Sequence, residues 1–323
     1  MIAARRLLLV VLAVALGLAC AQALAQDYPT RPVRVLVGSA AGGSPDIMAR
    51  TVSTQIGHDL GQQFYVENQS GANTTLAIGT VVKAEPDGYT LLFSLGSIAP
   101  IPYVYKNLRY DILRDLMPIA TIGVLDGFVM AIHPALPATT VAHFIQYART
   151  NHVVYGSVGV GSTPHLAAEI FKVKTGIAMD HVPFRGSGDV AVALLSQSIH
   201  MMFVSPPAVL DMIKSGQLRA LALSGSKRLA ALPDVPLMTD FVPDYPVTRS
   251  WGIFFAPANT PSAIIERLNA VIRKAVRSAA VGNVLQGIGY EPDERSPAAT
   301  AAFYREQVEA AGEAVRAARI QPN

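Results

Sequence analysis

Short apolar runs alternate with helix-like patterns along most of this chain. Residues 33–37 predict a strand, and the apolar spacing over residues 45–60 predicts a helix. Further strands are expected at 64–66, 90–93, 117–124, 128–132, 153–155, 201–203 and 220–223. Further helices are expected at 76–83, 139–148, 164–175, 188–196 and 206–215. This alternation is typical of α/β sheets in which most strands are parallel.

The last part of the chain has a different pattern. A strand-like run at 251–257 precedes two long helical patterns at 261–280 and 297–318, and Thr260-Pro261 and Ser296-Pro297 are expected to cap their starts. Two α/β units with a returning tail predict two lobes, each a mainly parallel sheet flanked by helices, with a ligand cleft between them. We expect the first lobe to comprise residues 26–128 plus 249–323, and the second to comprise residues 129–248.

The first 25 residues have the order of a secretory signal peptide. Arg5 and Arg6 precede an uncharged apolar run over 7–18, and Ala23-Leu24-Ala25 supplies small residues for cleavage. The apolar run is shorter than the roughly 20 residues that span a bilayer. We therefore expect an exported protein that starts near Gln26. A lipoprotein starting at Cys20 is the alternative, but Gly17-Leu18-Ala19 is a poor lipobox.

Removal of this segment changes the composition. The 323 residues include 26 basic and 23 acidic side chains, and without Arg5 and Arg6 the basic count is 24, so the net charge falls from +3 to +1. Such a balanced chain has no footprint for nucleic acid. Cys20 is the single cysteine, so the mature chain has no thiol chemistry. The seven histidines lack metal-ligand spacing, and we expect no metal and no cofactor.

Three loops share one design of strand, short loop, hydroxyl residue, proline and helix. They contain Ser44-Pro45, Ser162-Thr163-Pro164 and Ser205-Pro206. The hydroxyl is expected to cap each helix, whose free amides and dipole favour an anion. Ordinary helix starts have the same pattern, so each motif alone is weak. Asp46 in a first helical turn either caps that helix or orders waters and amides around a ligand.

Enzyme signatures are absent from the sequence. It contains no Gly-x-Ser-x-Gly elbow, no Walker loop and no His-Glu-x-x-His motif. Ser162 and His165 lack a third orienting group and do not form a credible dyad. A binding protein without enzymatic activity is therefore favoured. Two alternatives stay open: a secreted hydrolase that uses Ser162 or Ser44, and an adaptor that binds protein.

The mature chain resembles the Bug family, the periplasmic receptors of tripartite tricarboxylate transporters, over essentially its whole length. The motifs that carry the resemblance are Tyr28-Pro29, Arg31-Pro32-Val33-Arg34, Ala41 to Asp46, Val66-Glu67-Asn68, Pro86 to Leu91, Gly161 to Leu166, Val182 to Gly186, Asp234-Val235-Pro236 and Trp251-Gly252. The resemblance implies a periplasmic Venus-flytrap protein, usually a monomer, that closes on a small organic carboxylate. It also implies delivery of this ligand to membrane transporter subunits or a sensor.

The resemblance also implies which residues line the cleft. Backbone amides and waters in the loop of Ala41, Gly42, Gly43, Ser44, Pro45 and Asp46 would hold one carboxyl group. Gly161, Ser162 and Thr163 form the matching loop of the second lobe, and Ser94 and Ser97 lie in a third loop that usually lines the cleft. Ser205, from the third hydroxyl-proline motif, completes the expected site.

Two positions depart from the family pattern. The run 200–204 ends in Val204 where relatives often have an aspartate, which removes a partner for a ligand ammonium group if that position lines the cleft. We therefore expect a ligand without an amino group. Residues 72–75 replace a more glycine-rich run, with no consequence that the sequence identifies.

Overall fold

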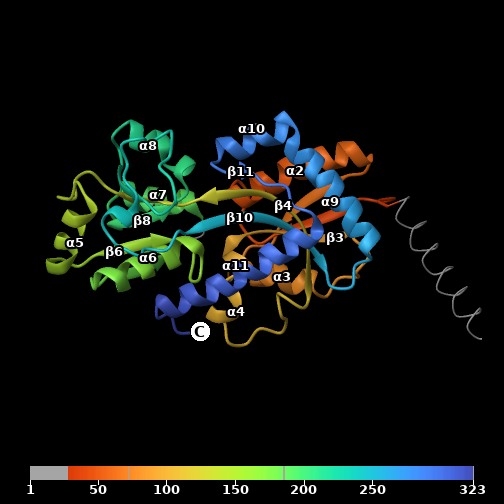
Figure 1. Ribbon diagram of the computed structural model, residues 1–323, viewed down its shortest axis with the longest axis horizontal. Coiled ribbons are helices and arrows are strands. Elements are labelled where there is room, and N and C mark those ends of the chain that lie inside the picture. Colours follow the sequence, from red (N-terminus) through yellow and green to blue (C-terminus); the bar gives the residue numbers. More distant parts are fainter. Residues whose placement is uncertain (1–27, 72, 185, 323) are drawn as a thin grey trace, which may run out of the picture.

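The computed structural model describes residues 28–71, 73–184 and 186–322, which form two lobes side by side (Figure 1). The expected signal peptide, including Cys20, lies outside the described residues. Each lobe is built on one sheet, and helices cover both faces of each sheet.

The first lobe contains a six-stranded sheet in the order β11-β4-β10-β3-β1-β2. Its strands are β1 (Val33–Val37), β2 (Phe64–Asn68), β3 (Thr90–Leu95), β4 (Leu116–Asp126), β10 (Arg249–Pro257) and β11 (Glu291–Pro292). Its helices are α2 (Ser44–Leu60), α3 (Thr75–Val81), α4 (Ile101–Val104), α9 (Ser262–Arg277), α10 (Ala279–Gly287) and α11 (Pro297–Ala317). Alternate side chains of β1 face opposite ways, so α2, α9 and α10 pack on one face of the sheet and α3, α4 and α11 on the other.

The second lobe contains a five-stranded sheet in the order β7-β6-β8-β5-β9. Its strands are β5 (Val129–Ile132), β6 (Val154–Ser157), β7 (Asp180–Pro183), β8 (Met201–Val204) and β9 (Arg219–Leu223). Its helices are α5 (Val141–Thr150), α6 (Thr163–Thr175), α7 (Ser187–Leu195) and α8 (Leu210–Lys214). Helices α5 and α6 contribute to the cluster on one face of this sheet, and α7 packs on the other.

The two-lobed α/β fold is therefore confirmed, but both sheets are mixed rather than mainly parallel. In the first lobe β1 runs parallel to β2 and β3, whereas β10 runs antiparallel to β3 and β4. In the second lobe β6 runs parallel to β7 and β8, whereas β5 runs antiparallel to β8 and β9. The antiparallel strands β4, β5 and β10 carry the chain between the lobes. An apolar strand pattern does not reveal this change of direction.

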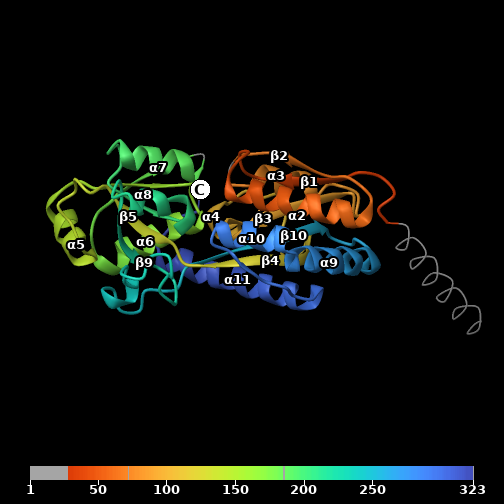
Figure 2. The same ribbon diagram turned by 90° about the horizontal axis from the view of Figure 1, so that it is seen from above.

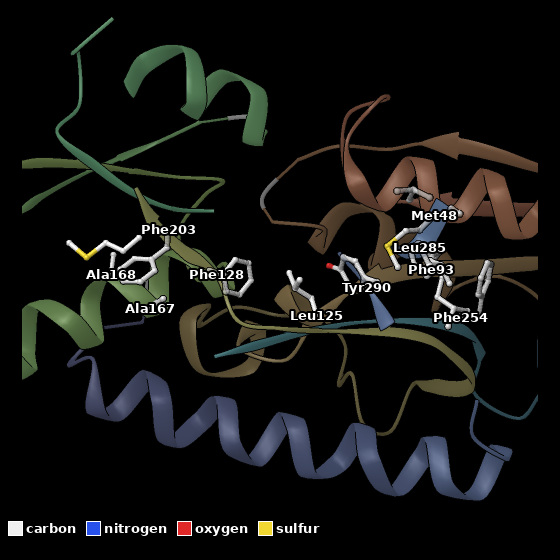
Figure 3. Packing of buried hydrophobic residues seen from close by; sticks show 14 of the residues in the cluster. Met48, Phe93, Leu125, Phe128, Ala167, Ala168, Phe203, Phe254, Leu285 and Tyr290 are labelled. Carbon is white, nitrogen blue, oxygen red and sulfur yellow. The ribbon is translucent and has the colours of Figure 1, made fainter. Parts of the chain in front are cut away.

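The lobes share a continuous apolar core at these crossovers. Leu125 at the end of β4 and Phe128 just before β5 lie between the buried residues of the two lobes (Figure 3). The same buried cluster includes Met48 and Phe254 in the first lobe and Phe203 in the second. The long helix α11 runs below both lobes (Figures 1 and 2), and Val315 near its end packs against Leu166 of α6.

Three predicted helix features are wrong. The pattern at 261–280 is two helices, α9 and α10, which are separated at Ser278, whose side chain caps α10. The pattern at 206–215 is a short 3-10 turn, η2 (Pro206–Ala208), followed by α8. Thr260 does not cap α9, because its hydroxyl donates to Pro257 O (2.8 Å). The predicted cap at Ser296 is confirmed, since its Oγ accepts from Ala299 N (3.2 Å).

Over residues 28–71, 73–184 and 186–322, none of the helices combines the length and the apolar character that crossing a membrane requires.

Candidate ligand-binding site

The loop between β1 and α2 is organised by the carboxylate of Asp46. Its Oδ2 accepts from Gly42 N (2.9 Å), and its Oδ1 accepts from Arg50 Nε (3.0 Å) and Asn68 Nδ2 (2.9 Å). Asn68 Nδ2 also donates to Ser39 O (3.0 Å), and Arg50 Nη2 donates to Asn68 Oδ1 (2.9 Å). These bonds hold the loop at Ser39 and at Gly42 through side chains that lie beneath it.

The ionisation of Asp46 follows from these contacts. Burial raises the pKa of a carboxyl group, but bonds from Arg50, the Gly42 amide and Asn68 outweigh this effect, and the pKa of Asp46 lies below its ordinary value. The side chain is only 5% exposed, so it is a buried anion whose oxygens are engaged by its loop and by Arg50 and Asn68. Asp46 therefore orders a loop amide, and the expectation that this amide lies around a ligand stays a prediction.

The predicted cap at Ser44 is wrong, because Gly43 is the N-cap of α2 and makes no side-chain cap bond. The first backbone bond of this helix runs from Ile47 N to Gly43 O (3.0 Å), so the earlier amides have no partner within the helix. Ala41, Gly42 and Gly43 are exposed, and Ser44 and Pro45 are half-buried. The loop thus presents free donors and a hydroxyl at the positive end of a helix.

A second loop of the first lobe lies beside this one, because β1 and β3 are parallel neighbours. Ser97 is half-buried in the turn η1 (Gly96–Ile98), and its carbonyl oxygen accepts from Asn73 Nδ2 (3.3 Å). Ser94 lies inside β3 and not after it as expected. It is 4% exposed, and its hydroxyl donates to Leu95 O (3.3 Å). Ser97 is therefore better placed than Ser94 to meet a ligand.

The loop between β6 and α6 in the second lobe has the cap that the sequence predicts. Ser162 is the N-cap of α6, and its Oγ accepts from His165 N (3.4 Å) and donates to Gly159 O (2.7 Å). Gly161 and Ser162 are buried, whereas Thr163 is half-buried. Gly161 has a φ of +78°, which favours glycine. Both hydroxyl functions of Ser162 are thus engaged within its loop.

The third hydroxyl-proline motif differs from the other two. Ser205 is half-buried at the start of a three-residue 3-10 turn and makes no cap bond. Val204 is 3% exposed and packs in the apolar cluster under α7. The predicted helix start at Ser205 is wrong, because the 3-10 turn η2 follows it and α8 begins only at Leu210. A role for Ser205 in ligand binding stays a prediction.

Contacts link the first-lobe loops to the second-lobe loop. A Cβ on Gly38 would clash with Thr74, and Asn73 next to it bonds to Ser97 as described. The chain then enters α4, where Val104 lies 3.2 Å from the position of a Cβ on Gly161. Val104 of the first lobe therefore lies directly against Gly161 of the second-lobe loop, which places the two lobes in contact beside this loop.

The geometry does not support a serine nucleophile. Ser162 is fully buried, and the Nδ1 of His165 accepts from Gly161 N (3.2 Å) instead of facing Ser162 Oγ. No histidine is bonded to Ser44 within the described residues. Among these same residues, no group of three or more His, Cys, Asp or Glu side chains could hold a metal ion.

Sequence reasoning missed four side chains that shape the loops. Arg50 and Asn68 hold Asp46, and Ser157 and His181 lie behind the second-lobe loop, where Ser157 Oγ is 2.7 Å from His181 Nε2. Asn68 and Ser157 each end a strand next to a predicted loop, which is the signal that could have identified them. His181 carries no such signal, because β7 was not predicted.

The fold and the paired loops define a two-lobed solute-binding protein without enzymatic features. The chain belongs to the tripartite tricarboxylate transporter family receptors, whose family model matches residues 48–320. It is 34% identical over 291 residues to the protein BugT of Bordetella pertussis, with 88% of each chain covered. The expected Bug-family membership and the absence of an enzymatic role are therefore confirmed, since this is a family of periplasmic receptors.

Solved structures agree with this assignment. A protein of R. palustris with adipate has a TM-score of 0.85 and 31% identity, covering 92% of this chain and 100% of its own. The protein MatC of Rhodopseudomonas palustris with bound malate has a TM-score of 0.82 and 26% identity, covering 89% of this chain and 100% of its own. The periplasmic binding protein BugD has a TM-score of 0.84 and 25% identity, covering 92% and 100%.

Proposed function

We propose that this receptor captures a small organic carboxylate between loop 38–46 of the first lobe and loop 157–163 of the second. Free amides at the start of α2, the Ser44 hydroxyl and bridging waters would hold one carboxyl group. Thr163 and Ser97 would contact the rest of the ligand. The observation that carries the proposal is the exposed glycine loop at the positive end of α2, a 17-residue helix. Asp46 holds this loop by accepting a hydrogen bond from the Gly42 amide. The adipate and malate that two similar structures bind support this ligand class.

The charges of the loops narrow the ligand further. Loops 38–46, 94–98 and 157–163 and the pair 204–205 contain one charged residue, Asp46, and its oxygens already accept three donors. A ligand ammonium group would thus lack a free counter-charge there, and burying it unpaired is costly. We therefore propose a carboxylate without an amino group. Arg185, in the connection from β7 to α7, lies outside the described residues.

We also propose how the receptor works in the cell. The sequence of residues 1–25 supports export as a signal peptide, and family membership supports transfer of the ligand to membrane transporter subunits, or to a sensor. Residues 26–128 plus 249–323 would move against residues 129–248 as the lobes close, and the protein would act as a monomer. Closure converts ligand binding into a surface that a partner can recognise.

A thermal-shift screen tests the carboxylate proposal. The protein from Gln26 onward is heated with a panel of small organic acids, including adipate and malate, and with the corresponding amides. A ligand at 100 times its dissociation constant stabilises the folded state by about 2.7 kcal/mol. We expect one class of acids to raise the melting temperature and the amides to leave it unchanged. Denatured protein is checked by mass spectrometry for a co-purified acid, and absence of both signals would favour the adaptor alternative.

Calorimetry tests the exclusion of amino groups. Aspartate and glutamate are titrated beside succinate and glutarate, which have the same carbon chains without the amino group. We expect at least about tenfold weaker binding of the amino acids, because a charge left unpaired in a buried site costs well over 1 kcal/mol. Tight binding of aspartate or glutamate would refute this part of the proposal and leave the carboxylate site itself in place.

A further inference from the structure

One buried and one half-buried histidine, His165 and His181, lie directly behind the second-lobe loop. His165 stands in the first turn of α6 and is 5% exposed, and His181 stands in β7. Their ring centroids are 4.3 Å apart, and the ring of Tyr155 stacks on His181 at 4.9 Å. The proposed function makes no use of this cluster.

The hydrogen bonds assign a role to each ring. The Nδ1 of His165 accepts from Gly161 N (3.2 Å), so it must carry a lone pair and its ring must be neutral. Ser157 Oγ accepts from Gly159 N (3.2 Å) and donates to Gly159 O (3.1 Å). Since a hydroxyl has one proton, the Nε2 of His181 is then the donor in its 2.7 Å contact with Ser157 Oγ. The bond to Gly161 thus requires a neutral His165 ring, whereas the bond from His181 to Ser157 is retained in both charge states of His181.

We infer that His165 and His181 are positioning residues which hold loop 157–163 in its ligand-binding shape, and that protonation of His165 releases the loop. The inference rests on the proposed function, because it assigns the pair to the second-lobe half of the carboxylate site. A proton on His165 Nδ1 would place two N–H groups against each other and break the bond to Gly161. The ligand is then retained at neutral pH and released in acid.

The charges around the pair favour the neutral rings. Burial lowers the pKa of His165 to about 3, with further lowering by His181 and Lys172. Burial lowers the pKa of His181 to about 4, where Glu169 opposes and Lys172 adds to the effect. Glu169 is itself occupied, because it accepts from Lys172 Nζ (2.7 Å) and from the Tyr155 hydroxyl. Among the described residues, the other titratable groups near the cluster are Asp180, which pairs with His152, Arg319 after α11, and Tyr105 beside α4. Asp180 and Arg319 line the same hollow as Glu169 and Lys172.

The sign of the pH effect follows from these shifts. A histidine in the released loop regains a pKa of about 6.5, which is above its value in the ordered loop. The released loop therefore binds more protons as the pH falls below about 6.5. His165 then favours release by up to about tenfold per pH unit, until its pKa in the ordered loop is reached near 3.

Nuclear magnetic resonance of the ligand-free protein tests the inference. Correlations of the ring nitrogens should show His165 as a neutral Nε2–H tautomer at pH 7, with Nδ1 unprotonated. The amide of Gly161 should be protected from hydrogen exchange at pH 7, and its protection should fall as the pH is lowered from 6.5 to 4.5. An ordinary titration of His165 near pH 6.5 with no change at Gly161 would overturn the inference.

Three variants separate positioning from packing. In His165→Asn, the side-chain oxygen can replace Nδ1 as the acceptor but cannot take a proton, so Gly161 protection is retained and loses its dependence on pH. In His165→Phe, the ring is kept without an acceptor, and Gly161 protection falls at pH 7 by about tenfold, the effect of one hydrogen bond. His152→Asn changes an exposed histidine, 71% exposed in its side chain, and should have no effect at Gly161.

Malate and adipate serve as probes for the link to binding at pH 7.5. For the acid that the wild-type protein binds, we expect His165→Phe to raise the dissociation constant by about tenfold. We expect His165→Asn to raise it by less than about threefold. Equal losses in both variants would show that His165 only packs, and would overturn the positioning role. The resonance measurements use no ligand, so they decide the behaviour of the loop even if the wild-type protein binds neither acid, which would count against the proposed function instead.

Discussion

The carboxylate of Asp46 binds three donors of its own protein surroundings, one of them in its own loop. Its partners are the backbone amide of Gly42 and the side chains of Arg50 and Asn68, and only Asn68 is distant in sequence. Sequence reasoning placed Asp46 in the first turn of a helix correctly and left its role open. The role could not be predicted further, because Asn68 reaches it through the pairing of β1 with β2, which is a tertiary contact.

Replacement of Asp46 by asparagine should make stability less sensitive to pH. The folded-state pKa of Asp46 is below its unfolded value, so its contribution is present above about pH 4 and is lost as the pH falls through the folded pKa. We expect Asp46→Asn to lower the free energy of unfolding by about 1–3 kcal/mol at pH 7, and by less at pH 3, because the charge is lost and one carboxylate oxygen becomes an NH2 group that cannot accept a hydrogen bond. Urea unfolding at both pH values measures this difference.

Glu67→Gln is the matched control for Asp46. Glu67 also accepts from an arginine, Arg34, but its side chain is 47% exposed, and exposed ion pairs contribute about 1 kcal/mol or less. A cost for Asp46→Asn that is no larger than the cost for Glu67→Gln would contradict the bracing role of Asp46.

The two predicted capping serines should respond differently to alanine. Ser162 is buried with both hydroxyl functions bonded, so Ser162→Ala should lower stability by about 1–2 kcal/mol. Ser44 makes no cap bond, so Ser44→Ala should change stability by less than about 0.5 kcal/mol while weakening ligand binding. Denaturant unfolding and calorimetry on the same two proteins separate these effects, and a large stability loss in Ser44→Ala would show an overlooked structural bond.

The positions of helices and strands along the chain were predicted better than the pairing and direction of the strands. Most strand and helix positions follow from apolar periodicity, because each element must bury one face whatever the topology. The sequence did not reveal β7 (Asp180–Pro183), which has a mostly exposed pattern, or the break between α9 and α10. It also did not predict the antiparallel crossover strands, since strand direction depends on how the chain passes between the lobes.

Gly161 should be the position of the second-lobe loop that tolerates a larger side chain least. Gly161→Ala adds a Cβ to a residue with a φ of +78°, and this atom would lie 3.2 Å from Val104 of the other lobe. Gly42→Ala is the control, because its φ is +81° but its Cβ would meet open space. We expect a cost of about 1 kcal/mol for Gly42→Ala from backbone strain and a cost larger by 1 kcal/mol or more for Gly161→Ala. Equal costs by urea unfolding would show that the lobes do not meet there.

At the scale of the whole molecule, hydrogen bonds join the two segments that connect the lobes, residues 126–128 and residues 224–249. We call this group of bonds the polar clasp. Asp126 at the end of β4 accepts from Arg249 Nε (3.0 Å), Ser226 N (3.1 Å) and Ser226 Oγ (2.8 Å). Beside it, Ser224 Oγ accepts from Phe128 N (2.9 Å) and contacts Thr248 Oγ1. Neither crossover can therefore shift without disturbing the other.

Removal of the clasp should loosen the orientation of the lobes. Asp126→Ala removes the acceptor of three donors, and we expect a loss of stability of about 1–3 kcal/mol and a larger radius of gyration without ligand in small-angle scattering. Lys227→Ala is the control, because its ion pair with Glu291 near the same crossover is highly exposed and contributes little. An unchanged scattering profile in Asp126→Ala would mean that the apolar core at Leu125 and Phe128 alone sets the orientation.

The central claim is that a small carboxylate binds amides of both lobes at once. The most direct measurement is an amide chemical-shift titration of the protein from Gln26 onward with the acid that stabilises it best. We predict simultaneous shifts at Gly43 and Ser44 in the first lobe and at Gly161 to Thr163 in the second, with one dissociation constant for all of them. Shifts confined to one lobe, or centred away from both loops, would contradict the account.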